Sequence, residues 1–184
     1  MDRVKRIVDA AVELAEEGGF EHVRQREVAA RAGVTLRTLY RKFRTKEELL
    51  TAAMAREADA LEAELLRRPP RGASAEERLS AFFAAMTRVL TRRPALGKAV
   101  VRAMASGASG TAAHVVAFQG RAMALVVGAA APEPIGPDIV FLLLQIHFAC
   151  LVGWSADLAG PKDVDEQMTR AIGIVLRGAR QGCP

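Results

Sequence analysis

The chain has 184 residues, a formal net charge of +5 and an apolar share of 51%. That share is ample for a folded core, and the low aromatic share of 5%, beside many alanines and leucines, favours helices. The two cysteines, Cys150 and Cys183, exclude a disulfide framework and suit a reducing compartment. We therefore expect a helical protein of one domain or two small ones.

The first 20 residues contain no charged stretch followed by an apolar run, so no secretion signal is expected. The longest apolar runs, Ala122–Pro132 and Ile139–Leu144, are shorter than the ~20 residues that a membrane helix needs. These patterns predict a soluble, cytoplasmic protein without a membrane partner.

Turn and capping residues divide the chain into about nine predicted helices. The predicted ranges are residues 3–17, 24–32, 36–43, 46–66, 74–93, 95–105, 111–130, 137 or 138 to 158, and 162–178. Gly18 and Gly19 end the first helix, and Gly33 separates the second from the third. Because no alternating strand pattern and no repeat is visible, the predicted class is all-α.

Three helices also begin at recognisable caps. Thr35 is a candidate N-cap for the third helix. Thr45–Glu48 and Ser74–Glu77 both have the hydroxyl and the carboxylate three residues later that form a capping box. These caps predict that the fourth and fifth helices begin close to residues 46 and 75.

The basic side chains are concentrated in residues 24–46, which carry eight Lys or Arg and one Glu, or +7 in a chain of net +5. A charge run alone is compatible with a solvated amphipathic helix. Ala29, Gly33 and Val34, followed by the capped third helix, instead favour a helix-turn-helix, because its tight turn needs a glycine and its crossing needs a small residue. We therefore predict a helix-turn-helix domain over residues 1–46.

The third helix is the predicted DNA-reading element. Its outer face would present side chains to bases in the major groove, where Arg bonds guanine and Thr bonds bases or phosphates. The predicted base-reading residues are Thr35, Arg37, Thr38 and Arg41. The predicted phosphate-contacting residues are Tyr40, Lys42, Arg44 and Lys46, with a packing role as the alternative for Tyr40.

The same region resembles the TetR family of bacterial transcriptional regulators. The resemblance lies in Gly19-Phe20-Glu21, Val28–Thr35, Thr38–Phe43 and Lys46–Leu50. Where the family has Thr or Ser capping the second helix, this chain has Val23-Arg24-Gln25, so Arg24 or Gln25 is expected to make that DNA contact instead.

The resemblance implies an all-helical repressor that binds double-stranded operator DNA as a homodimer. It also implies a second helical domain over residues 47–184 that holds a small-molecule effector, with no cofactor and no bound metal. Such a protein is expected in the bacterial cytoplasm, associated with the nucleoid when it is bound to DNA.

Large apolar side chains on the middle helices are the candidates for an effector pocket, although ordinary core packing is the simpler explanation for each residue taken alone. The candidate ligand-binding residues are Phe82, Phe83, Met86, Leu90, Val101, Met104, Phe118, Arg121, Phe141, Leu144, Gln145 and Phe148. Arg121 would pair with an anionic group of the ligand or reach solvent. His147 and Cys150 are a weak metal signal, and a structural histidine is favoured.

The last two helices are the predicted dimer interface. Residues 139–158 are apolar on nearly every side, and Val164, Met168, Ile172, Val175 and Leu176 form one stripe of the final helix. Two such helices from each chain would make a four-helix bundle about a two-fold axis.

The C-terminal half also resembles the TetR branch that controls steroid catabolism in actinobacteria. The shared features are Thr91–Leu96, the Ala-rich helix after it, and the order Trp154, Asp163-Val164, Gln167. This resemblance implies a bulky, largely apolar effector, such as a steroid-like acid or its acyl-CoA thioester.

Two other functions remain open at this point. One is a ligand-independent DNA-binding regulator or activator with a filled core. The other is an enzyme, which the sequence disfavours, because it has no Gly-rich phosphate loop and no G-x-S-x-G elbow.

Overall fold

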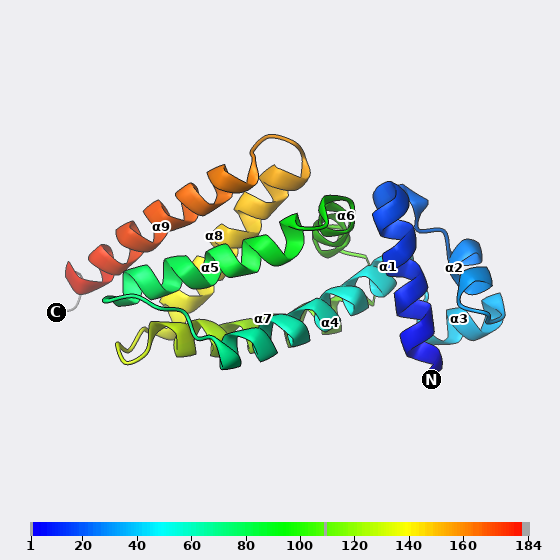
Figure 1. The fold of residues 1–184 in the computed structure, drawn as a ribbon, viewed down its shortest axis with the longest axis horizontal. Helices are drawn as coiled ribbons and strands as arrows, with labels where there is room; N and C mark the ends of the chain where they lie inside the picture. The colour runs from blue at the N-terminus through cyan, green and yellow to red at the C-terminus, as the bar shows by residue number, and fades with distance from the viewer. Residues whose placement is uncertain (1, 109, 182–184) are drawn as a thin grey trace. The chain divides into compact units, whose positions relative to one another are not determined.

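The computed structural model describes residues 2–108 and 110–181, with the backbone but not the side chains of residues 60, 64, 66 and 114. Over these residues the chain forms nine helices and no strand, so the predicted all-α class is confirmed (Figure 1). The helices are α1 (Arg3–His22), α2 (Gln25–Arg31), α3 (Leu36–Lys42), α4 (Lys46–Arg67), α5 (Ala75–Thr91), α6 (Pro94–Ala105), α7 (Thr111–Ala130), α8 (Pro137–Ser155) and α9 (Pro161–Gln181).

Three helix ends differ from the prediction by three residues or more: α9 runs on to Gln181 rather than 178, and the other two are those of α1 and α8. α1 continues to His22, but its regular geometry breaks at Gly18 and at Gly19, which has a φ of +69°. The predicted glycine stop is therefore where the regular helix ends. α8 ends at Ser155 rather than near 158, because Asp157 adopts a φ of +61° and the Leu158 N–H bonds back to the Gly153 carbonyl at 3.0 Å.

The helices form two compact units. The first contains the residues up to Asp59 together with Leu90–Phe118, and the second contains Ala60–Val89 and the residues from Gln119 on. α4, α5 and α7 each contribute residues to both units. The domain boundary predicted after residue 46 stays a prediction.

The first unit is built on the apolar face of α1. Ile7, Val8 and Leu14 are buried there at the spacing of one helical stripe, and α6 packs against α1 with Leu96 and Val101 also buried. Each such side chain stabilises the fold by about 1.5–3 kcal/mol when it is fully buried. The first unit, which includes the basic helices α2 and α3, therefore has a well-packed apolar core.

The second unit is centred on aromatic and long aliphatic side chains. Phe82 and Phe83 of α5 are fully buried, and their rings meet edge to face at 5.3 Å between centroids. Leu143 of α8 and Met168 of α9 are also fully buried, and these two helices lie side by side. The residues expected to line a pocket therefore include the main core of this unit.

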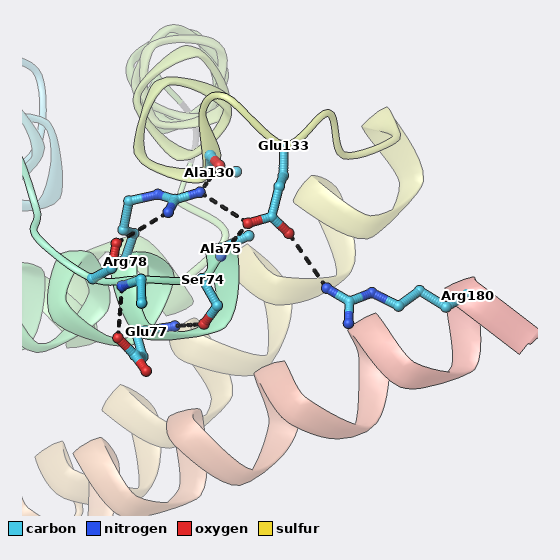
Figure 2. Close-up of polar contacts among 9 residues, drawn as sticks. Ser74, Ala75, Glu77, Arg78, Ala130, Glu133 and Arg180 are labelled. Carbon is cyan, nitrogen blue, oxygen red and sulfur yellow. Dashed lines mark hydrogen bonds and ion pairs between the residues drawn. The ribbon is translucent and has the colours of Figure 1, made fainter.

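The predicted N-cap at Ser74 is confirmed, but the carboxylate half of the capping box is bonded to Ala73, one residue before the cap. The Glu77 N–H donates to the Ser74 hydroxyl at 3.2 Å, and the Ala73 N–H donates to the Glu77 carboxylate at 2.8 Å (Figure 2). The bond from Glu77 satisfies a backbone donor that the first turn of α5 would otherwise leave unpaired, and the bond from Ala73 fixes the residue before the cap.

A carboxylate from a distant segment also caps α5. Glu133, in the loop between α7 and α8, accepts from the Ala75 N–H at 2.8 Å and from Arg78 at 3.2 Å, and lies 3.4 Å from Arg180 of α9 (Figure 2). Arg78 also donates to the Ala130 carbonyl at 2.7 Å. The bond from Ala75 is the main cause of a lowered pKa at Glu133. The Glu133 carboxylate thus links the start of α5 to the end of α9, and Arg78 links α5 to the end of α7.

Candidate nucleic-acid interface

The turn between α2 and α3 has the geometry that the sequence predicts. Gly33 adopts a φ of +62°, and the Val34 N–H donates to the Ala29 carbonyl at 3.0 Å. Ala29 is buried, as a crossing point between helices requires, and Leu39 of α3 is completely buried. Val34 is only half-buried. The turn fixes α3 relative to α2 and leaves its opposite side in solvent.

α3 begins at the predicted cap. The Thr38 N–H donates to the Thr35 hydroxyl at 3.2 Å, and the two threonine hydroxyls lie 2.9 Å apart. This pairing fixes the orientation of both side chains before any ligand arrives. The first turn of α3 therefore presents a fixed polar edge.

The outer side of α3 forms a cationic face, which we call the reading face. Its members are Thr35, Arg37, Thr38, Tyr40, Arg41 and Lys42. All are exposed except Thr38, which is half-buried, and Tyr40 is 45% exposed. An exposed aromatic ring among cations favours a phosphate contact over the packing role considered for Tyr40. Arg44 follows, also exposed, in the link to α4.

Arg24 and Gln25, which stand where the TetR pattern has a capping Thr or Ser, have different surroundings. The Arg24 side chain is 73% exposed and lies 3.4 Å from Glu27. The Gln25 amide instead donates to the Arg44 carbonyl at 2.9 Å and to the Phe43 carbonyl at 3.4 Å. Gln25 thus ties the start of α2 to the end of α3, while Arg24 is the more available for DNA.

Two basic residues of the segment are engaged inside the protein. The Arg31 guanidinium pairs with Glu17 of α1 at 3.1 Å and so lies away from the reading face. Lys46, at the start of α4, lies 3.2 Å from the Glu21 carboxylate. The sequence count of +7 therefore overstates the charge that the reading face presents.

The link between α3 and α4 is held by a buried acid. The Glu48 N–H donates to the Thr45 hydroxyl at 3.2 Å, which confirms that predicted cap, and Glu48 in turn accepts from the Arg44 N–H at 2.6 Å. Glu48 is 9% exposed. Gly110, with a φ of +93°, lies against it so closely that an added Cβ would be 1.7 Å from a carboxylate oxygen. Sequence spacing reveals Glu48 as a cap but gives no sign of Gly110.

The candidate ligand-binding residues fall into three groups. Five are buried, namely Phe82, Phe83, Met86, Leu90 and Val101. Four are half-buried, namely Met104, Phe118, Leu144 and Phe148. Three are exposed, namely Arg121, Phe141 and Gln145. Arg121 is ion-paired with Glu62 of α4. Leu90, Val101, Met104 and Phe118 belong to the first unit, and the others belong to the second.

His147 is buried in the second unit at 3% exposure. Its Nε2 lies 3.0 Å from the Thr87 hydroxyl, and its ring centroid is 5.1 Å from that of Phe83. The Thr87 hydroxyl also lies 3.0 Å from the Phe83 carbonyl oxygen. Burial lowers the pKa of His147 to about 4. Among the described residues, no group of three or more His, Cys, Asp or Glu is placed to hold a metal ion.

Two helices of the structure are long and, on average, strongly apolar. α7 and α8 have mean hydropathies of 1.3 and 1.7, and by length and composition alone each is able to cross a membrane. The sequence prediction considered only uninterrupted apolar runs and so missed these longer helices. On one face of α8 the side chains of Val140, Leu143 and His147 are buried in the second unit.

Comparison with known proteins identifies the family. Residues 7–53 match the model of the bacterial regulatory proteins of the tetR family, and residues 72–175 match a tetracyclin repressor-like C-terminal domain. The chain belongs to the TetR family. Its relatives are transcriptional regulators rather than enzymes, and it is itself a DNA-binding transcriptional repressor. Regulators of this family are soluble cytoplasmic proteins.

The similarity extends over nearly the whole chain. It is 30% identical over 178 residues to the HTH-type transcriptional repressor KstR of Mycolicibacterium smegmatis, covering 95% of this chain and 87% of that protein. A TetR regulator from Rhodococcus sp. RHA1 matches with a TM-score of 0.84, 26% identity and 95% of both chains. AibR, in complex with isovaleryl coenzyme A and operator DNA, matches with a TM-score of 0.53, 25% identity, and 95% and 96% of the two chains.

Proposed function

We propose that this repressor is a homodimer that leaves its operator when a bulky, largely apolar small molecule binds the C-terminal helices. The observation that carries the proposal is the end-to-end similarity to KstR repressors, together with the exposed reading face of α3. Bound to its operator, the dimer is associated with the nucleoid.

The reading face supports insertion of α3 into the major groove. Arg37 and Arg41 are exposed and suited to bidentate bonds with guanine, whereas Lys42 and Arg44 are suited to phosphates. Two reading faces in one dimer would enter successive major grooves about 34 Å apart. The operator is therefore expected to contain two related half-sites.

An exposed apolar face on α8 supports the dimer. We call this the α8 face, and its members are Phe141, Leu142, Gln145, Ala149 and Val152. Phe141 is 51% exposed and Leu142 46% exposed. The opposite side of α8 is buried in its own unit. The α8 face can therefore be covered by one flat apolar surface, and the helix does not need lipid on all sides. The same helices of a second copy provide one, forming a four-helix bundle.

The effector class is proposed from relatives and from side-chain chemistry. AibR has been crystallised with a coenzyme A thioester, and the sequence resembles the branch that controls steroid catabolism. The half-buried Leu144 and Phe148 of the second unit are able to rearrange around an apolar ligand. An acyl-CoA or steroid-like acid fits these features.

One observation favours the alternative of a ligand-independent regulator. Phe82, Phe83 and Val101 are at most 1% exposed, as in a filled core. The two functions differ in how the protein responds to ligand, so a binding experiment separates them.

The test is a thermal-shift screen with acyl-CoA and steroid-acid ligands, followed by gel-shift assays on the DNA upstream of the protein's own gene. A ligand at about 100 times its Kd stabilises the folded state by about 2.7 kcal/mol, or roughly 5–10 °C in Tm. The same ligand should release the DNA. Salt-sensitive DNA binding without any stabilising ligand would favour the ligand-independent regulator, and elution as a monomer in size-exclusion chromatography would refute the dimer.

A further inference from the structure

The Lys46 side chain is held by the end of α1. Its ammonium lies 3.9 Å from the centroid of the Phe20 ring and 3.4 Å from the Phe20 carbonyl oxygen. It also lies 3.2 Å from one oxygen of Glu21, and only 26% of the side chain is exposed. The residue expected to bind a DNA phosphate is therefore already bound to an anion of its own chain.

Glu21 is shared with a second cation from α6. Its other carboxylate oxygen lies 2.7 Å from the Arg102 guanidinium, and the carbon of that guanidinium is 4.3 Å from the centroid of the Phe20 ring. One carboxylate and one aromatic ring thus serve two cations. Hydrogen bonding to Lys46 is the main cause of the lowered pKa of Glu21, so the carboxylate stays charged throughout the neutral range.

We propose that Glu21 is an internal competitor of DNA phosphate for Lys46, and that Arg102 sets the strength of this competition. A Lys ammonium is a point charge with three donors, and every contact with a carboxylate reduces its attraction for a phosphate. Arg102 opposes this effect by drawing the same carboxylate to itself. Glu21 therefore weakens DNA binding through Lys46, and Arg102 partly restores it.

The arrangement makes DNA affinity sensitive to the position of α6. A displacement that lengthens the contact between Arg102 and Glu21 returns the carboxylate to Lys46 and lowers affinity. The proposal rests on a phosphate contact by Lys46, which the experiment tests separately.

The experiment measures binding of the full-length protein to a fluorescein-labelled 30-bp duplex of arbitrary sequence, by anisotropy between 50 and 200 mM NaCl. Sequence-independent DNA suffices because phosphate contacts do not depend on base identity. Lys46→Ala should reduce the slope of log K against log salt by about 0.9, as the loss of one phosphate contact predicts. An unchanged slope would show that Lys46 does not contact phosphate and would overturn the proposal at its base.

Glu21→Gln should bind about two- to fivefold more tightly at low salt, as expected for a surface ion pair, and the gain should fade as salt screens it. In a Lys46→Ala background the gain should fall to the small gain that removal of any acid of α1 produces. Glu13→Gln is the matched control, because it removes one acid from the same helix without touching Lys46, so its small effect should persist in the Lys46→Ala background. Unchanged or weaker binding by Glu21→Gln would overturn the competition.

Arg102→Ala distinguishes competition from a direct DNA contact. It should weaken binding in the wild-type protein and have no effect in the Glu21→Gln protein, because there is no carboxylate left to withdraw. An equal loss in both backgrounds would show that Arg102 touches DNA or acts through Phe20, and would refute its assigned role.

Discussion

α3 and α8 both leave one side of a helix in solvent, but the two exposed sides have opposite chemistry. On α3 the reading face presents Arg37, Arg41 and Lys42, above a completely buried Leu39. On α8 the exposed side presents Phe141, Leu142 and Val152, opposite a buried Leu143. Each helix is anchored by one face and offers the other to a partner.

The difference indicates what each partner must be. Exposed guanidinium and ammonium groups cost little in water and gain by displacing counterions from a polyanion. Exposed aromatic and aliphatic groups gain only when another apolar surface covers them. The chemistry of α3 therefore suits DNA, and the chemistry of α8 is the basis for proposing a second copy of the chain as its partner.

The largest expected effect comes from placing a charge on the α8 face. Phe141→Glu should raise the dimer dissociation constant at least about 100-fold, because an unpaired carboxylate would be buried on association. Operator affinity should fall with it, since a single reading face contacts one half-site. Light scattering and operator titration measure the two effects. Val116→Glu, at a 66% exposed site of α7, is the matched control, and a Phe141→Glu protein that remains dimeric would place the interface elsewhere.

Acid should lower the stability of the second unit, which contains the buried His147, more than it affects the reading face. Because burial lowers the pKa of His147 from 6.5 to about 4, the unfolded chain binds a proton in this range that the folded chain does not. Its contribution is complete above pH about 6.5 and decreases as pH falls towards 4, by about 2 kcal/mol at pH 5. Urea unfolding at pH 7 and pH 5 measures the change.

His147→Leu is the control for the acid effect. Thr87 keeps its bond to the Phe83 carbonyl in this variant, so no hydroxyl donor is left unpaired. The variant should lose much less stability between pH 7 and pH 5 than the wild-type protein. An equal loss would show that another group causes the acid sensitivity.

A base-reading arginine should affect specificity rather than stability. Arg41→Ala should cost about 1–3 kcal/mol of discrimination between operator and arbitrary DNA, with an unchanged Tm. Competition anisotropy against both duplexes gives the ratio. Arg31→Ala is the control, because Arg31 pairs with Glu17 away from the reading face. A loss that is equal for both duplexes would make Arg41 a phosphate contact.

The smallest effect is expected at the charged cluster of the second unit. Glu133→Gln weakens the bonds to Arg78 and Arg180 and should lower the Tm slightly, with operator affinity unchanged. Differential scanning fluorimetry at low and high salt measures the difference. Glu166→Gln, exposed on α9, should leave the Tm unchanged. Altered DNA binding by Glu133→Gln would show that this cluster also takes part in regulation.

The reading face was predictable because its requirements are local. A φ above zero at Gly33, a small residue at Ala29 and a hydroxyl at Thr35 each appear in the sequence at fixed spacing, and the structure contains all three features. The charge of the face was harder to predict. Arg31 and Lys46 are paired with acids of α1, and Arg102 reaches Glu21 from a helix 81 residues later.

The sequence pattern did not distinguish buried from exposed apolar residues in the C-terminal helices. Phe83 and Phe141 occur in similar apolar stretches, yet one is completely buried and the other is 51% exposed. Their exposure depends on which neighbouring helix covers them, and this is set by tertiary packing rather than by periodicity. The effector-binding residues for this reason remain predictions. The ends of the helices that carry them agree with the sequence prediction to within a few residues.

Through Gly110, the loop between α6 and α7 contacts Glu48, which holds the link between α3 and α4 in place. Any side chain there would collide with Glu48, whose carboxylate holds the Arg44 N–H at the junction of α3 and α4. In a saturation library selected for repression, position 110 should therefore tolerate glycine alone, as strictly as the turn at position 33. Genetic screens for constitutive expression should recover changes at this loop glycine, 64 positions beyond the last basic residue of the DNA-binding segment.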